Sequence, residues 1–141
     1  MLKSKTMVDG ISVIEMIKRK FDKPNRAVRI PMPGGRLFKA TMTEEGIMVD
    51  NLGSRPLLPW IVFEEVVKLL ARNGGRAANG NAISSKLGDA GLSLESVEGQ
   101  VAHWVYGKRV GDSVFRRILP ITAILVWAGL CYAIPHELML R

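Results

Sequence analysis

The chain has 141 residues, 48% of them hydrophobic, with a formal net charge of +7 and a pI near 9.9. This hydrophobic content excludes a disordered chain, and the length suits one ordinary domain or two small ones sharing a core. A basic balance favours polyanionic partners, either nucleic acid or an anionic membrane surface. Cys131 is the single cysteine and cannot form an internal disulfide, and no secretory signal pattern opens the sequence, so we expect a cytoplasmic protein.

The positive charge is concentrated in the first part of the chain. Residues 1–58 contain eleven basic and six acidic residues, an excess of five, whereas residues 59–141 contain nine and seven, an excess of two. We therefore treat 1–58 and 59–141 as two regions, either separate or parts of one continuous domain.

A short amphipathic helix is predicted over about 12–21. Ser12 and Glu15 have capping-box spacing, and isoleucines recur at three- and four-residue intervals up to Phe21. The triplet Lys18-Arg19-Lys20 forms the last turn, where the negative end of the helix dipole favours cations. The dipole explains this triplet about as well as phosphate binding does.

The next segment predicts a small antiparallel β-meander. Apolar residues alternate over 28–32 and 38–42 around the turn Pro33-Gly34-Gly35, and a third strand is expected at about 47–51. The period of two places Arg29 and Lys39 on the face opposite the apolar side chains, with Arg26 and Arg36 near its ends. A two-stranded ribbon can enter the major groove of DNA, so this face is a candidate contact surface. The alternative is an ordinary polar sheet face in water.

The second region is predicted to be helical. One helix starts at Pro59 and ends before Asn73, followed by a long connection over 76–91 with one turn near 83–87. A second helix runs from about Ser93 to Gly107 with Trp104 facing inward, and a third begins at Asp112 or Ser113. Pro120 either kinks the third helix or starts a new one. Strands at 131–134 and 138–141 are expected to close the chain as a hairpin.

The apolar run 118–134 has three possible environments: a buried core, a subunit interface or a membrane anchor. Seventeen helical residues reach about 25 Å, less than the roughly 30 Å of a bilayer core, so we expect burial in protein and no membrane partner. A tail-anchored membrane protein is the less favoured alternative.

This order of helices followed by a terminal hairpin resembles a winged helix-turn-helix domain. The segment 124–130, Ile-Leu-Val-Trp-Ala-Gly-Leu, together with the strand after it, resembles the end of the third helix and the start of the wing. Over residues 59–141 the chain is loosely similar to the N-terminal domain of Mrr-type restriction proteins, which implies a DNA-binding fold. The sequence departs from that pattern because Thr122 is the one polar residue over 121–128 and the wing tip carries His136 and Glu137. We therefore expect no base reading by the helix and no phosphate contact from the wing.

A second basic group surrounds a glycine-flanked turn and the N-terminus of the third helix. It consists of Lys108, Arg109, Arg116 and Arg117, which we predict to contact phosphate, since backbone N–H groups at a helix N-terminus also favour anions. The alternative is a solvated turn in which Arg116 and Arg117 face water.

No catalytic constellation, metal-ligand spacing or cofactor motif is recognisable, so we expect no enzyme activity, metal or cofactor. The sequence predicts an α+β protein that binds nucleic acid, with double-stranded DNA as the expected partner. The alternative is a protein-interaction or homo-oligomerisation module using the apolar third helix.

Overall fold

The computed structural model describes residues 7–8 and 11–141, and its first helix begins where the capping box predicts. Strands β1 (Met7–Val8) and β2 (Ile11–Ser12) form a two-stranded antiparallel sheet. The Ser12 side chain then accepts the backbone N–H of Glu15 at the start of α1 (Val13–Phe21). Val13, Ile17 and Phe21 are buried on one face, so the predicted amphipathic helix is confirmed.

The predicted meander is present and has one more strand than expected. Strands β3 (Ala27–Pro31), β4 (Leu37–Met42), β5 (Gly46–Val49) and β6 (Leu57–Pro59) lie in this order in an antiparallel sheet. The third strand ends at Val49 instead of Asn51. Gly46 lies close to β6, because a Cβ there would overlap the carbonyl oxygen of Leu58. The short strand β6 was not predicted, since its three residues follow one proline and end in another, and offer no alternating pattern.

Helix α2 (Trp60–Arg72) begins directly after β6 and forms the centre of the molecule. Pro59 is its N-cap residue, and a continuous apolar stripe that includes Phe63, Val66 and Leu70 is fully or almost fully buried. The chain then forms β7 (Arg76–Ala78), which was not predicted, and a 3-10 turn η1 (Ala90–Leu92). The predicted long connection therefore contains one strand and one helical turn, and this turn lies at 90–92, after the predicted 83–87.

Helix α3 (Val97–Trp104) is shorter at both ends than predicted. The hydroxyl of Ser96, not of Ser93, caps it by accepting the backbone N–H of Gly99 at 3.1 Å. The expectation that Trp104 faces inward was wrong, because Trp104 is 64% exposed. It ends the last turn of the helix and contacts the ring of His103 edge-on at 4.9 Å between centroids.

Helix α4 (Ile118–Trp127) begins five or six residues later than predicted. The Asp112 carboxylate accepts the backbone N–H of Arg109 and so closes a turn instead of capping a helix. Of the two alternatives for Pro120, the helix start is correct, because proline occupies the first turn. The helix ends as expected before Gly129, which has a φ of +83°.

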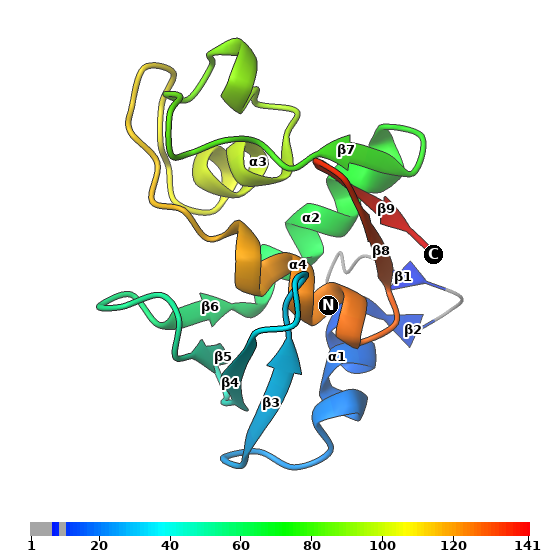
Figure 1. Cartoon of the computed structure of the whole chain (residues 1–141). Coiled ribbons are helices and arrows are strands. Elements are labelled where there is room, and N and C mark those ends of the chain that lie inside the picture. Colours follow the sequence, from blue (N-terminus) through cyan, green and yellow to red (C-terminus); the bar gives the residue numbers. More distant parts are fainter. Residues whose placement is uncertain (1–6, 9–10) are drawn as a thin grey trace.

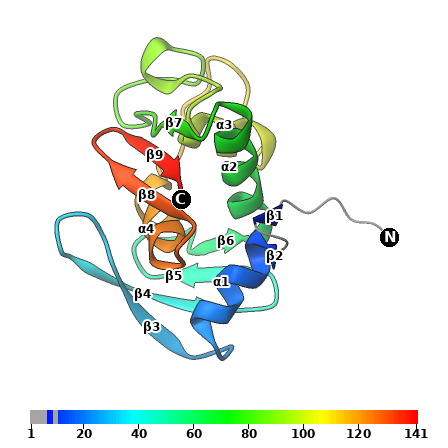
Figure 2. The same ribbon diagram turned by 90° about the vertical axis from the view of Figure 1, so that its right-hand side faces the viewer.

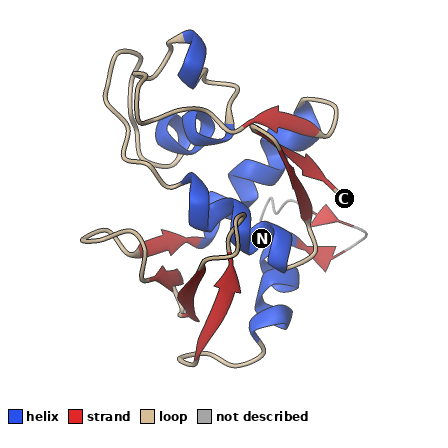
Figure 3. Ribbon diagram, viewed as in Figure 1, coloured by secondary structure: helices blue, strands red, loops and turns tan. Residues whose placement is uncertain are grey.

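The chain closes with β8 (Cys131–Ile134) and β9 (Glu137–Leu140), the predicted terminal hairpin. Strand β7 pairs with β9 on its other side, so the third sheet has the order β7-β9-β8. Figures 1 and 3 show this sheet beside α2 and α4, with the four-stranded meander below them.

The two sequence regions share a hydrophobic core. One buried cluster contains residues of the meander, such as Ile30 and Ile47, together with residues of α2 and α4, such as Phe63 and Ile124. Strand β3 contacts α4 directly, and α1 contacts α2. Figure 2 shows α1 lying across the meander.

Burial of α4 was predicted, and the structure confirms it for most of the helix. Seven of its ten residues are buried, while Leu119 and Val126 are 37% and 38% exposed. The chain's own core therefore takes up most of the apolar surface that a subunit interface through α4 would need. No helix within residues 7–8 and 11–141 has the length and apolar character required to cross a bilayer.

Candidate nucleic-acid interface

The first predicted basic group lies on the exposed face of the β3–β4 hairpin. Arg29 and Lys39 occupy directly opposed positions of the two strands, and both side chains are exposed. Like charges on opposed residues of adjacent strands repel each other. An anion placed between the two side chains relieves this repulsion, so the pair favours a negatively charged partner.

Arg26 and Arg36 extend this group toward the two ends of the hairpin, and both are exposed. Arg26 immediately precedes β3. Arg36 lies in the turn, where its carbonyl oxygen accepts the backbone N–H of Met32 at 2.7 Å. The hairpin thus presents four cations, the hairpin cations, from one end to the other: Arg26, Arg29, Arg36 and Lys39.

One carboxylate reduces the positive potential of this face. Asp50 follows β5, and its Oδ1 accepts the backbone N–H of Lys39 at 2.9 Å. Arg29, Lys39 and Asp50 line a shallow hollow of about 270 Å³. The hollow is therefore only partly positive, and its affinity for an anion depends on both cations acting together.

The second predicted basic group lies on the turn after α3. The carbonyl oxygen of Lys108 is 2.8 Å from Nδ1 of His103, and the backbone N–H of Lys108 bonds to the carbonyl of Ala102. Arg109 is exposed and Lys108 is half-buried. These backbone bonds fix the turn, so its cations project from an ordered segment.

Arg116 and Arg117 are neighbours in sequence but occupy different environments. Arg116 is exposed, whereas Arg117 is only 6% exposed. The guanidinium carbon of Arg117 lies 3.7 Å from the ring centroid of Tyr106 and 4.8 Å from that of Phe115. The alternative that Arg117 faces water was wrong, because these two rings cover its guanidinium. The predicted phosphate contact of Arg117 is therefore left out of the interface described below. The accessible turn cations are Lys108, Arg109 and Arg116.

The N-terminus of α4, predicted to attract an external anion, already holds one from the same chain. The two carboxylate oxygens of Glu98 accept the backbone N–H groups of Arg117 and Ile118 at 2.7 and 3.0 Å. Burial raises the pKa of Glu98 to about 7, although these two bonds and the charge of Arg117 lower it. Burial also raises the pKa of Tyr106 and lowers the pKa of Arg117. This helix end therefore leaves no free N–H pair for phosphate.

Ion pairs leave the hairpin and turn cations free. The structure contains three ion pairs in residues 7–8 and 11–141: Lys68–Glu65, Arg72–Glu95 and Arg76–Glu137. None of them uses a hairpin cation or a turn cation. These seven side chains thus have no carboxylate partner within that part of the chain.

The basic triplet at the end of α1 has a structural use. The amino group of Lys18 lies 5.3 Å from the ring of Trp60, and that of Lys20 lies 5.4 Å from the ring of Trp127. Cation–π contacts at partly exposed sites stabilise by about 0.5–1 kcal/mol. Together with the helix dipole, these contacts account for two of the three cations without any external ligand.

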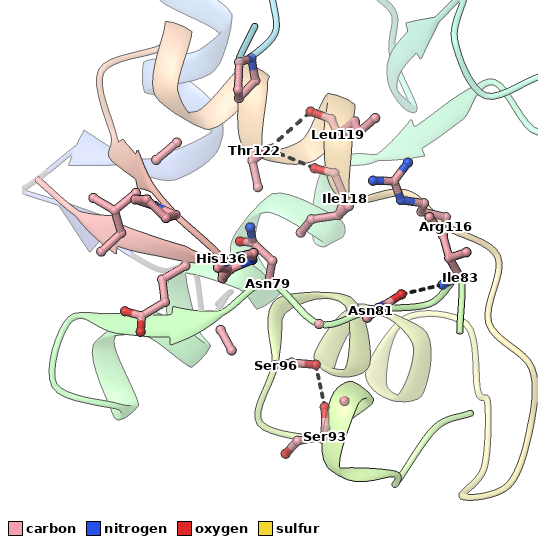
Figure 4. A pocket seen from close by; sticks show the side chains of 18 of the residues that line it. Asn79, Asn81, Ile83, Ser93, Ser96, Arg116, Ile118, Leu119, Thr122 and His136 are labelled. Atoms are coloured by element: carbon pink, nitrogen blue, oxygen red, sulfur yellow. Dashed lines mark hydrogen bonds between the residues drawn. The ribbon is translucent and has the colours of Figure 1, made fainter. Parts of the chain in front are cut away.

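Between the β8–β9 hairpin and α4 lies a cavity of about 790 Å³ (Figure 4). We call it the wing cavity, after the element that the sequence predicted for this hairpin. The first turn of α4 forms one wall, and the segment Asn79-Gly80-Asn81 forms the opposite one. Arg116 lies at one end, and His136 lies beside Asn79. The cavity was not predicted, because its walls come from four separate segments and the sequence of 76–91 carries no known motif.

The wing cavity also connects the two basic groups in space. Pro33, in the turn of the β3–β4 hairpin, lines the same cavity as Arg116 and His136. Figure 2 shows the β3–β4 and β8–β9 turns extending on the same side of the molecule. The hairpin tip and the end of the second basic group therefore lie on one side.

Cys131 is buried in the core, as its apolar surroundings predict. Burial raises the pKa of its thiol to about 12, so the nucleophilic thiolate is scarce at neutral pH.

No protein-family model, curated protein or solved structure matches this chain. The geometry of the exposed cations is therefore what supports the assignment of this interface.

Proposed function

We propose that this chain is a non-catalytic nucleic-acid-binding protein whose partner is double-stranded DNA. Two sets of cations hold the phosphates: the hairpin cations Arg26, Arg29, Arg36 and Lys39, and the turn cations Lys108, Arg109 and Arg116. Such contacts position a protein on the duplex and supply most of its sequence-independent affinity.

The opposed pair of Arg29 and Lys39 is the observation that carries this proposal. Both side chains are exposed, they face each other across β3 and β4, and neither has a carboxylate partner in the described chain. A sheet face shaped by folding alone gains nothing from opposed like charges. Two cations on neighbouring strands suit adjacent phosphates of a polyanion, which repays the cost of holding them together.

The arrangement of the second region supports the DNA-binding fold that its sequence resembles. Helix α2, strand β7, helices α3 and α4 and the hairpin β8–β9 follow one another in the order expected for a winged helix. The strand order β7-β9-β8 places the hairpin beside the first strand of that region. The basic turn precedes α4, and the wing turn lies across the cavity from it.

Base reading by α4 is not part of this proposal. A recognition helix exposes polar side chains to base edges, whereas the buried α4 has Thr122 bonded to its own backbone, donating to the carbonyl of Ile118. The meander strand β3 contacts the helix. We therefore expect binding through phosphates, with little dependence on sequence.

The test is fluorescence anisotropy with a labelled duplex, titrated at several salt concentrations, for the natural chain and the double variant Arg29→Ala/Lys39→Ala. Each phosphate contact contributes about 0.9 to the slope of log K against log salt. Loss of two contacts should lower the affinity and reduce that slope by about 1.8. Thermal stability should not fall, because the variant also removes the cross-strand repulsion.

The matched control is Lys68→Ala/Arg72→Ala, which removes the same charge from α2, where both cations are paired with carboxylates. This control should retain the affinity and slope of the natural chain. If both double variants lost affinity equally, net charge alone would explain the effect. An unchanged slope in Arg29→Ala/Lys39→Ala would remove the hairpin from the interface.

A further inference from the structure

The wing cavity has the size and lining of a ligand site. Its volume of about 790 Å³ lies within the roughly 300–1,000 Å³ typical of small-molecule sites. Ile118 and Leu119 of α4 and Ile134 and Pro135 of the wing provide apolar surface. Asn79, Asn81, Arg116 and His136 provide polar groups. A flat ring with a polar edge and an attached anion suits this combination.

Asn79 is the central polar group of the cavity. Its Oδ1 is buried and has no hydrogen-bond partner in residues 7–8 and 11–141. Its backbone is fixed on both sides, since its N–H donates to the carbonyl of His136 at 2.8 Å and its carbonyl accepts the N–H of Glu98 at 2.9 Å. A buried amide oxygen without a partner is destabilising, and a ligand donor that reached this oxygen would offset that cost.

Asn81 supplies donors on the same wall. Its Oδ1 accepts the backbone N–H groups of Ile83 and Ser84, which fixes the side chain and leaves the amide N–H₂ unused in the described structure. Gly80 separates the two asparagines with a φ of +88°, and a Cβ there would lie 2.6 Å from Oγ of Ser96. The glycine lets this wall run close against the start of α3.

The charges at the cavity favour an anion at the Arg116 end. Glu137 also lines the cavity, but its Oε1 is 2.9 Å from Nε of Arg76, which offsets its charge. Arg116 has no such partner among the described carboxylates, and its guanidinium can bind a phosphate in bidentate fashion. The polar groups thus consist of two asparagine amides on one wall and a phosphate binder at one end.

We infer that the wing cavity binds a nucleotide, with its base against the Asn79 and Asn81 amides and its phosphate on Arg116. Every nucleobase edge offers hydrogen-bond donors and acceptors that an asparagine side chain complements, and apolar side chains cover the ring faces. The nucleotide comes either from solution or from a duplex by extrusion of one base. Only the duplex source rests on the proposed function.

The solution source is tested by titrating AMP into the ¹⁵N-labelled chain and following backbone resonances. We expect saturable shifts at Asn79, Asn81 and His136, and at least fivefold weaker binding in Asn79→Ala and in Arg116→Ala. The matched control is Asn51→Ala, because Asn51 also has a buried Oδ1 without a described partner but does not line the cavity. The Asn79 side chain makes no hydrogen bond to other described residues, so the fold of Asn79→Ala should persist.

The duplex source is tested with DNA containing 2-aminopurine, whose fluorescence rises when it leaves the base stack. A rise on binding that Asn79→Ala abolishes and Asn51→Ala retains would assign the site to an extruded base. AMP binding without that rise would assign it to free nucleotides. Absence of both signals would overturn the inference. Because the AMP titration needs no duplex, a chain that fails to bind DNA still tests the cavity.

Discussion

The carboxylate of Glu98 in α3 accepts the backbone N–H of Arg117 at 2.7 Å, at the residue that precedes α4. Its second oxygen accepts the N–H of Ile118 at 3.0 Å, so one side chain caps a helix about twenty residues later in the chain. The guanidinium of the same Arg117 lies over Tyr106 in the connecting segment. This arrangement fixes α4 relative to α3. It also places the guanidinium of Arg117, a predicted phosphate contact, against an aromatic ring of the same chain.

The first prediction concerns the pH dependence of stability. Burial raises the pKa of Glu98 in the folded chain to about 7 from an ordinary 4.5, so folding favours the protonated form. Its contribution is fully present below about pH 4.5 and is lost as the pH rises through 7, by about 3 kcal/mol in total. Glu98→Gln should remove this loss. Denaturant unfolding at pH 5, 6, 7 and 8 measures it.

Glu95→Gln is the control for that series, because Glu95 is an exposed carboxylate in the neighbouring turn, paired with Arg72. Its free energy of unfolding should follow the natural chain across the pH range. A Glu98→Gln variant that keeps the pH dependence of the natural chain would show that another group titrates there.

The second prediction separates two adjacent arginines by one chemical change. Arg117→Met should lower the free energy of unfolding by about 2 kcal/mol, because it removes a desolvated cation–π contact with Tyr106. Arg116→Met should leave stability within about 0.5 kcal/mol, because Arg116 is exposed. It should instead reduce the salt slope of DNA binding by about 0.9. Unfolding curves and anisotropy on both variants test the assignment, and the reverse pattern would contradict it.

The third prediction concerns the single thiol. Cys131 is buried, with its pKa raised to about 12, so a disulfide-exchange reagent such as DTNB should react slowly with the native chain. In denaturant the same thiol should react at the rate of a free cysteine, at least a hundredfold faster. Rapid reaction of the native chain at neutral pH would show that the C-terminal sheet opens readily.

Local patterns accounted for the elements whose residues interact with near neighbours in sequence. The capping box of Ser12 and Glu15 placed the start of α1, and alternation around Pro33-Gly34-Gly35 gave the β3–β4 hairpin with Arg29 and Lys39 on its exposed face. Each signal is a repeat of 2 or 3.6 residues or a turn, and such repeats depend on backbone geometry alone.

Local patterns did not predict the short strands or the start of α4. Strands β6 and β7 have three residues each, too few for a period, and they exist because β5 and β9 pair with them. Asp112 is a residue type that often caps a helix, so the sequence predicted the start of α4 too early. A distant carboxylate, Glu98, capped the helix instead.

The sequence by itself determined the α+β composition, the basic hairpin, the terminal hairpin and the burial of the apolar run, because each follows from side-chain periodicity and hydrophobicity. Tertiary structure alone decided which cations are free, since Arg116 and Arg117 are indistinguishable until the rings of Tyr106 and Phe115 cover one of them. It also decided that Asn79 lines a cavity and that its Oδ1 has no hydrogen-bond partner among the described residues, because four distant segments must meet to enclose that space.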